Sequence, residues 1–263
     1  MKALLSLREL SAGYGGKLVV GGVSFDIFPG EFCALLGPNG SGKTTLLKAV
    51  CGLIPIESGQ CTVDGLDCTR QNEKKRARLI SYIPQRYSKL IGVTVLDAVQ
   101  MGHNAKLGML EFPSEADKAA SMAALEKMEI SHLAVEDFSR LSEGQKQMVV
   151  LARTLIQDAP VMLMDEPDSA LDFQNKHRAL EKIRRLIHTE GKSGLVTVHD
   201  PNLALAYCDR LILLHDGKVV SEIRVSEASG DEVRECLSNV YGDITLAEHN
   251  GKRIVYYTPH NSG

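Results

Sequence analysis

Eight residues near the N-terminus have the types and the spacing of a phosphate-binding loop. They read Gly37-Pro38-Asn39-Gly40-Ser41-Gly42-Lys43-Thr44 and fit the pattern G-x-x-x-x-G-K-[ST] in full. Glycines let backbone N–H groups face inward, so several donors converge on a phosphate at the positive end of a helix. In this pattern Lys43 reaches the β- and γ-phosphates, and the Thr44 hydroxyl is a ligand for Mg²⁺. The alternative is an ordinary glycine turn that caps a helix, but the motif and its context together favour a nucleoside triphosphate site.

Two adjacent carboxylates follow a later apolar run and can supply the other half of such a site. Val161–Met164 is typical of a strand buried on both faces, and it ends in Asp165 and Glu166. Asp165 is placed to hold Mg²⁺ through water, and Glu166 to take a proton from the water that attacks the γ-phosphate. Many apolar strands end in acidic residues, so this prediction depends on the phosphate-binding loop.

A third group lies 20 residues before Asp165, counted from Gln145. Ser142 followed three residues later by Gln145 is a capping box that begins a helix. A capped helix start with an exposed glycine amide, here Gly144, also attracts an anion. The capping box alone does not decide between a structural and a functional role.

The elements that must position these groups alternate between strands and helices. Glu31–Leu36 is a predicted strand before the loop, and Lys43–Val50 a predicted helix after it. Further helices are predicted at Val95–Met101, Glu115–Met128, Gly144–Ile156 and Phe173–His188, and further strands at Val161–Met164, Leu195–Val198 and Leu211–Leu214. This pattern predicts an α/β fold with a mainly parallel sheet covered on both faces, interrupted by a helical insertion. The tail is predicted to hold a helix from Val233 and a short strand at Arg253–Tyr257.

The composition excludes several classes of protein. Of the 263 residues, 44% are hydrophobic and 24% charged, and the net charge is -3, so a protein held on nucleic acid by phosphate contacts is disfavoured. No apolar stretch approaches the roughly 18 residues that span a bilayer, and Arg8 and Glu9 interrupt the short apolar start too early for a signal peptide. We expect a cytosolic protein whose six cysteines are small buried side chains without zinc-like spacing.

The motifs occur in an order that resembles the nucleotide-binding ATPase subunit of ABC transporters. The ordered set is Tyr14, residues 37–44, Gln85 in Tyr82-Ile83-Pro84-Gln85, LSEGQ at 141–145, MDEP at 164–167, Ser169-Ala170-Leu171-Asp172 and His199. The resemblance covers nearly the whole chain, and the LSEGQ-type signature is specific to this family among phosphate-loop proteins.

The resemblance implies a fold and a set of ligands. It implies a phosphate-loop NTPase core at 1–93 and 158–232 with an N-terminal antiparallel β subdomain, a helical insertion at 94–157 and a C-terminal extension at 233–263. It also implies ATP and Mg²⁺ as cofactors and a head-to-tail homodimer in which the signature of one subunit closes over the ATP of the other. The implied nucleotide-binding residues are Tyr14, Gly37, Pro38, Asn39, Gly40, Ser41, Gly42, Lys43, Thr44, Thr45, Ser142, Gly144 and Gln145.

The resemblance also assigns roles to single residues. Glu166, His199 and Gln85 are the implied catalytic residues, and Thr44, Gln85 and Asp165 the implied magnesium ligands. Tyr14 resembles the aromatic residue that stacks on adenine, although a turn tyrosine that only packs is the alternative. Asp172 is implied to connect the two sites of the dimer.

Two positions depart from the family pattern. Glu143 replaces the commonest glycine of the signature, and it either points into solvent as a first-turn acid or slows ATP-driven closure; we prefer the first. Asp168 stands where the family often has a small hydroxyl residue.

The resemblance favours a transport subunit over a soluble ABC ATPase that acts on DNA, ribosomes or cofactor assembly. Softer patterns at Val93–His103, Val240-Tyr241-Gly242 and Arg253-Ile254-Val255 are similar to importers of iron–siderophore, haem or cobalamin, with molybdate or another metal oxyanion as the rival. The implied partners are an integral-membrane permease, received on residues 86–110 at the cytoplasmic face, and a substrate-binding protein. A GTPase is disfavoured because Asn175-Lys176-His177-Arg178 lacks the acidic fourth residue of N-K-x-D.

Overall fold

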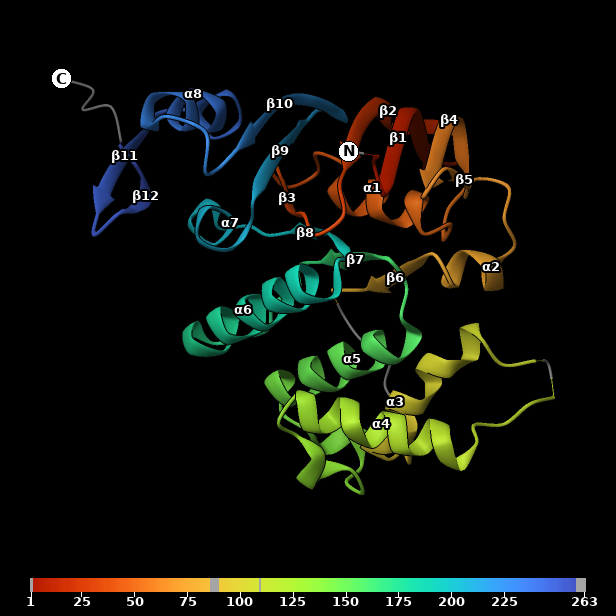
Figure 1. Ribbon diagram of the computed structural model, residues 1–263. Coiled ribbons are helices and arrows are strands. Elements are labelled where there is room, and N and C mark those ends of the chain that lie inside the picture. The colour runs from red at the N-terminus through yellow and green to blue at the C-terminus, as the bar shows by residue number, and fades with distance from the viewer. Residues whose placement is uncertain (1, 86–89, 109, 259–263) are drawn as a thin grey trace.

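A six-stranded sheet forms the centre of the computed structural model, which describes residues 2–85, 90–108 and 110–258 (Figure 1). The order of the strands is β10-β9-β3-β8-β7-β6, and all neighbours are parallel except β10, which is antiparallel to β9. The strands are β3 (Phe32–Leu36), β6 (Ile80–Ile83), β7 (Val161–Asp165), β8 (Ser193–Thr197), β9 (Arg210–His215) and β10 (Lys218–Arg224). The expected mainly parallel sheet is confirmed.

A second, fully antiparallel sheet is built by the N-terminal part of the chain. Its order is β2-β1-β4-β5, with strands β1 (Leu5–Tyr14), β2 (Lys17–Ile27), β4 (Ile56–Val63) and β5 (Leu66–Asp67). Helix α1 (Lys43–Val50) follows the phosphate-binding loop and packs beside this sheet. The expected N-terminal antiparallel subdomain is therefore present.

The central sheet is covered on both faces because its buried side chains alternate along each strand. In β3, Cys33 and Leu35 belong to a core shared with α1 and the antiparallel sheet. Phe32, Ala34 and Leu36 belong to a second core shared with the helices on the opposite face. The loop at the end of β3 is thus held between two packed cores.

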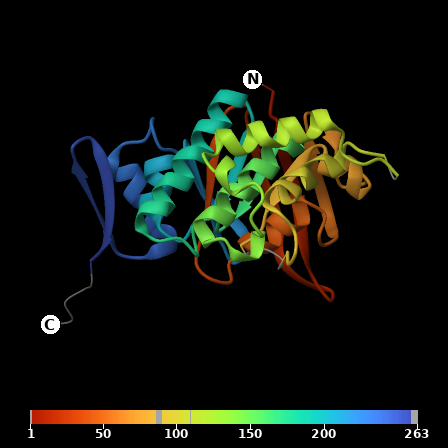
Figure 2. The same cartoon turned by 90° about the horizontal axis from the view of Figure 1, so that it is seen from below.

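The helices gather mainly below the central sheet in Figure 1, and they face the viewer in Figure 2, which shows the molecule from below. They are α2 (Glu73–Ala77), α3 (Val95–Gln100), α4 (Glu115–Lys127), α5 (Glu143–Gln157), α6 (Phe173–Glu190), α7 (Pro201–Tyr207) and α8 (Gly230–Tyr241), with 3-10 turns at Met101–Ala105, Ser131–Leu133 and Phe138–Arg140. Between residues 94 and 157 the described part of the chain has an isolated bridge, Thr94 to Asp137, but no strand. In the described ranges, none of the helices combines the length and the apolar character needed to cross a membrane.

The four helices predicted between residues 95 and 188 begin and end within two residues of the observed helices. The same holds for the three strands predicted between residues 161 and 214. The short or polar elements that were not predicted include β4, β5, β6, α2, α7, β10 and β11 (Ile244–His249). Strand β11 pairs only with β12 (Lys252–Tyr257), and together they form a separate hairpin. Strand β1 extends to Tyr14, because the turn that leads to β2 is confined to Gly15 and Gly16, which both have positive φ.

Candidate active site

The phosphate-binding loop connects β3 to α1, and its glycines are required by both backbone angles and packing. Gly40 has φ of 82° and Gly42 of 104°, a region that other residues rarely adopt. A Cβ atom on Gly37 would come within 2.1 Å of the Leu214 carbonyl oxygen, and one on Gly42 within 2.5 Å of a Val20 methyl. A larger residue at either position would therefore displace the loop from β9 or β2.

Lys43 places its amine over the loop. Its side chain is buried, and Nζ donates hydrogen bonds to the carbonyls of Gly37 at 2.8 Å and Pro38 at 3.0 Å. Burial lowers the pKa of Lys43, while the carboxylates of Glu166 and Asp165 act in the opposite direction. The loop thus presents a cation beside its backbone N–H groups, as phosphate binding requires.

Asp165 ends β7 and collects three hydroxyl donors. Its Oδ1 accepts hydrogen bonds from Thr44 and Thr197, both at 3.0 Å, and its Oδ2 accepts one from Tyr82 at 3.2 Å. Burial is the main cause that raises the pKa of Tyr82, and the negative charge of Asp165 is the second. The hydroxyl of Tyr82 therefore remains a donor at neutral pH. A carboxylate beside a threonine hydroxyl is an all-oxygen donor pair of the kind that suits Mg²⁺.

Glu166 lies between two predicted catalytic side chains. Its Oε1 is 2.7 Å from His199 Nε2, and its Oε2 accepts a hydrogen bond from Gln85 Nε2. The carboxylate is buried, and its backbone has φ of 48°, in the left-handed region, where the N–H donates to Thr197 Oγ1 at 2.8 Å. A carboxylate held at the rim of the phosphate loop by a histidine and a glutamine can accept a proton from a nearby water.

The signature residues form a separate group at the start of α5. The Ser142 hydroxyl accepts from the Gln145 N–H at 3.3 Å, and the Gln145 side chain accepts from the Ser142 N–H at 2.9 Å, which completes the capping box. Glu143 is half-exposed and pairs with Lys146 at 2.7 Å, so it points to solvent. A cavity of about 490 Å³ adjoins this helix start and includes no residue of the phosphate loop among its lining, which is Met128, Glu129, Ile130, Ser142, Gly144, Gln145, Met148, Leu171, Asn175, Arg178 and Lys182.

The remaining predicted residues lie around these two groups. Tyr14 is 49% exposed at the end of β1, and Thr45 is buried in α1. Asp172 caps α6 by accepting a hydrogen bond from the Asn175 N–H at 2.9 Å. Asp168 is buried, one of its carboxylate oxygens has no hydrogen-bond partner in the described residues, and burial raises its pKa.

Thr197 was missed by reasoning from the sequence, although it joins the two acidic residues. Its hydroxyl donates to Asp165 and accepts from the Glu166 N–H. A polar residue inside the apolar run before His199 was the available signal. Tyr82 lies in the same motif as Gln85, but its hydrogen bond to Asp165 was not predicted.

The chain is similar to known proteins in both sequence and fold. The family model "ABC transporter" matches residues 20–169. A Helicobacter pylori protein described as an iron chelatin transport ATP-binding protein is 36% identical over 96% of this chain and 99% of its own. One solved structure, described as a metal-chelate type ABC transporter in an inward-facing conformation, has a TM-score of 0.82 and 26% identity over 99% of both chains. A bacterial ABC transporter cassette solved as a dimer has a TM-score of 0.74 and 27% identity over 84% of this chain and 98% of its own.

Proposed function

Because the chain belongs to the ABC transporter family of ATPases, we propose that it powers the import of a metal chelate through a separate membrane permease. The chelate is of the iron–siderophore, haem or cobalamin type. The similarity to an iron chelatin transport ATPase and to a metal-chelate type transporter supports this substrate class over molybdate or another metal oxyanion. The same similarity favours transport over a soluble ABC ATPase.

The observation that supports ATP hydrolysis as the source of energy for import is the convergence of His199 and Gln85 on Glu166, one residue after Asp165. Lys43 and the loop N–H groups hold the phosphates of ATP. Glu166 accepts a proton from the attacking water, Gln85 orients that water, and His199 donates a hydrogen bond to the γ-phosphate as charge develops. Adenine stacks on the half-exposed ring of Tyr14.

The oxygen donors at the end of β7 fit a magnesium ion bound together with ATP. The Thr44 hydroxyl already lies 3.0 Å from the Asp165 carboxylate, and Gln85 lies against the neighbouring Glu166. We assign Thr44, Asp165 and Gln85 to this ion, which when bound neutralises charge on the phosphates.

Two copies of the chain are required to complete the site. The signature group and the phosphate loop line different regions of one chain, and a similar cassette was solved as a dimer. In the proposed head-to-tail dimer, Ser142 and Gly144 of one subunit contact the γ-phosphate held by the other. ATP then contacts two subunits in the closed state and one in the open state, so ATP binding favours closure. Asp172, which caps α6 beside the signature, connects the two sites.

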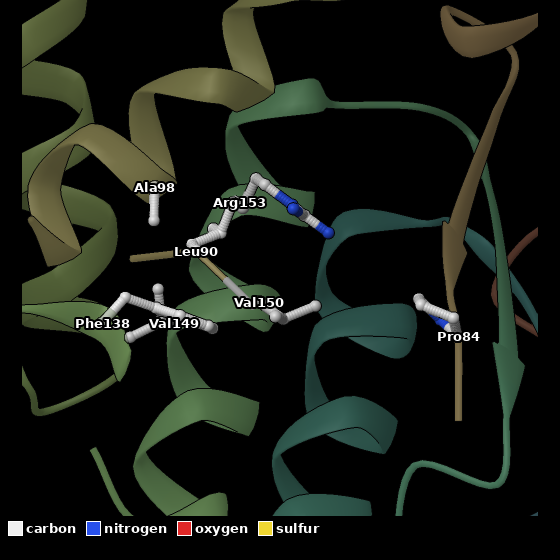
Figure 3. Close-up of a pocket in the computed structure, with 7 residues that line it drawn as sticks. All are labelled: Pro84, Leu90, Ala98, Phe138, Val149, Val150 and Arg153. Carbon is white, nitrogen blue, oxygen red and sulfur yellow. The ribbon is translucent and has the colours of Figure 1, made fainter. Parts of the chain in front are cut away.

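The surface proposed to receive the permease lies between β6, α3 and α5. A cavity of about 170 Å³ is lined there by Pro84, Leu90, Ala98, Phe138, Val149, Val150 and Arg153 (Figure 3). Within the predicted surface, residues 86–110, Ile91 is 77% exposed and Leu110 is 90% exposed. Of the predicted surface 86–110, residues 86–89 and 109 lie outside the described residues.

We retain the division into core, helical insertion at 94–157 and C-terminal extension at 233–263.

Purification from the native membrane tests the proposal. The tagged chain is extracted in mild detergent, with Lys43→Ala as a control that keeps the docking surface. We expect a polytopic membrane protein to copurify with the chain at near one-to-one stoichiometry, with the chain bound to its cytoplasmic face. In the complete system a substrate-binding protein should copurify as well. A soluble partner without any membrane protein would reject import. Uptake of labelled ferric siderophore, haem, cobalamin and molybdate by cells that carry wild type or Lys43→Ala then distinguishes the substrates.

A further inference from the structure

The two C-terminal motifs lie in one substructure, whose function the transport assignment leaves open. Val240-Tyr241-Gly242 ends α8, and Arg253-Ile254-Val255 lies in β12 of the separate hairpin. Figure 1 shows this hairpin at the edge of the molecule, beyond α7 and α8, on the side away from α3 and α4. We call α8, β11 and β12 together the C-terminal brace.

The brace is bound to the start of α7 by one side chain. Asn202 Nδ2 donates to the Val255 carbonyl at 3.0 Å, and its Oδ1 accepts from the Val255 N–H at 2.7 Å. The amide therefore pairs with both backbone groups of Val255, as a neighbouring strand would. Strand β12 also packs along α7.

Asn202 is only three residues after His199, and the connection between them is restrained. Asp200 caps α7 and accepts a hydrogen bond from the Asn202 N–H at 2.8 Å. Pro201 fixes the first helical residue. The side chain of His199 is 49% exposed and pairs with Glu166 at 2.7 Å. A shift of Asn202 therefore passes along a short, stiff segment to the histidine at the site.

The brace has two further anchors. Arg253 donates to the carbonyls of Val225 at 2.9 Å and Ala228 at 2.6 Å, which fixes the hairpin against the segment between β10 and α8. Helix α8 packs against β9 and β10 of the central sheet. The brace is thus held against the central sheet as well as against the segment that carries His199.

We propose that the C-terminal brace positions His199 for ATP hydrolysis, with Asn202 as the positioning residue that joins them. This inference rests on the proposed role of His199. Asn202 does not reach the nucleotide site itself, so it acts on the orientation of the histidine and not on ATP affinity.

Steady-state hydrolysis by full-length Asn202→Leu tests the inference. We expect kcat to fall between about 10- and 100-fold, because an imprecise catalytic group costs that much, while KM for ATP stays within about twofold. Lys252→Ala, at an exposed position of β12, is the control and should leave both constants unchanged. Unchanged kcat in a variant that only melts at lower temperature would overturn the proposal.

A double-mutant cycle separates positioning through His199 from any other effect. In a His199→Ala background, adding Asn202→Leu should lower the residual rate by less than about twofold, since the group that Asn202 positions is absent. Equal losses in both backgrounds would overturn the inference. Asn202→Asp, which keeps the acceptor for the Val255 N–H, should give a smaller loss of kcat and replaces Asn202→Leu if that variant does not fold. Full activity of His199→Ala alone would instead reject the proposed role of His199.

Discussion

Glu166→Gln is the most informative single change in the proposed site. The substitution preserves the size of the side chain but removes its negative charge and one acceptor oxygen. In the structure both carboxylate oxygens are engaged, Oε1 with His199 at 2.7 Å and Oε2 with Gln85. A glutamine can accept from only one of these partners, and its own NH₂ group must face the other. The variant therefore loses its base and disturbs the two residues around it.

The expected loss of rate follows from the role of a general base. Loss of such a base typically lowers the rate by about 10²–10⁴-fold, or about 2.7–5.4 kcal/mol in the activation free energy. ATP binding should be retained, because Lys43 and the loop glycines are unchanged. Slow hydrolysis of bound ATP should then trap the closed dimer.

Two measurements on one preparation check this. Phosphate release under saturating MgATP gives kcat, and size-exclusion chromatography with ATP gives the fraction of dimer. Glu190→Gln, the same change on the surface at the end of α6, is the control and should match wild type. Hydrolysis by Glu166→Gln at the parent rate would show that Glu166 is not the base, whatever its effect on dimers.

Four further changes test separate parts of the site. Lys43→Ala should weaken ATP binding by about 1.5–3 kcal/mol, the range for charged hydrogen bonds, in a calorimetric titration, and unchanged affinity would contradict the phosphate-loop assignment. Tyr14→Ala should lose about 1–3 kcal/mol of affinity for ATP and for GTP alike, whereas a tyrosine that only packs would leave both affinities intact. Ser142→Arg should bind ATP normally as a monomer. If the double variant Ser142→Arg/Glu166→Gln still dimerised fully with ATP, the contact of Ser142 across the interface would be excluded. Burial raises the pKa of Asp168, so the folded protein holds this proton more tightly than the unfolded chain and loses stability as pH rises above the ordinary pKa of 3.8. The melting temperature of Asp168→Ser should therefore exceed that of wild type by a margin that grows with pH, and a margin independent of pH would refute this.

The sequence predicted the elements whose pattern is long or fully apolar. Helices such as α5 and α6 have caps and amphipathic spacing, and β7 is a continuous apolar run, so local physics decides their structure. Strand β10 alternates between exposed and half-buried positions and depends on pairing with β9, which no local pattern reveals. Strand β12 was predicted, but its partner β11 was not. The position of this hairpin depends on hydrogen bonds made by Asn202, which lies outside it, and by Arg253, which lies within it.

Residues of the site were predictable where their types form a motif in the chain. Lys43, Asp165 and Glu166 are of this kind. The role of Thr197 depends on β8 lying between β3 and β7, so that its hydroxyl reaches two residues more than thirty positions earlier. Only the order of strands in the sheet brings these groups together.

The backbone conformation of Glu166 lowers the stability of the fold at a residue that hydrolysis requires. A glutamate at φ of 48° is strained by about 1–3 kcal/mol relative to an unconstrained conformation. Asparagine or glycine would adopt this angle more readily, so the residue that serves hydrolysis is not the one that best serves folding. A library of variants selected for heat resistance alone should therefore accumulate replacements at position 166, and each gain in thermal tolerance there would be accompanied by loss of turnover.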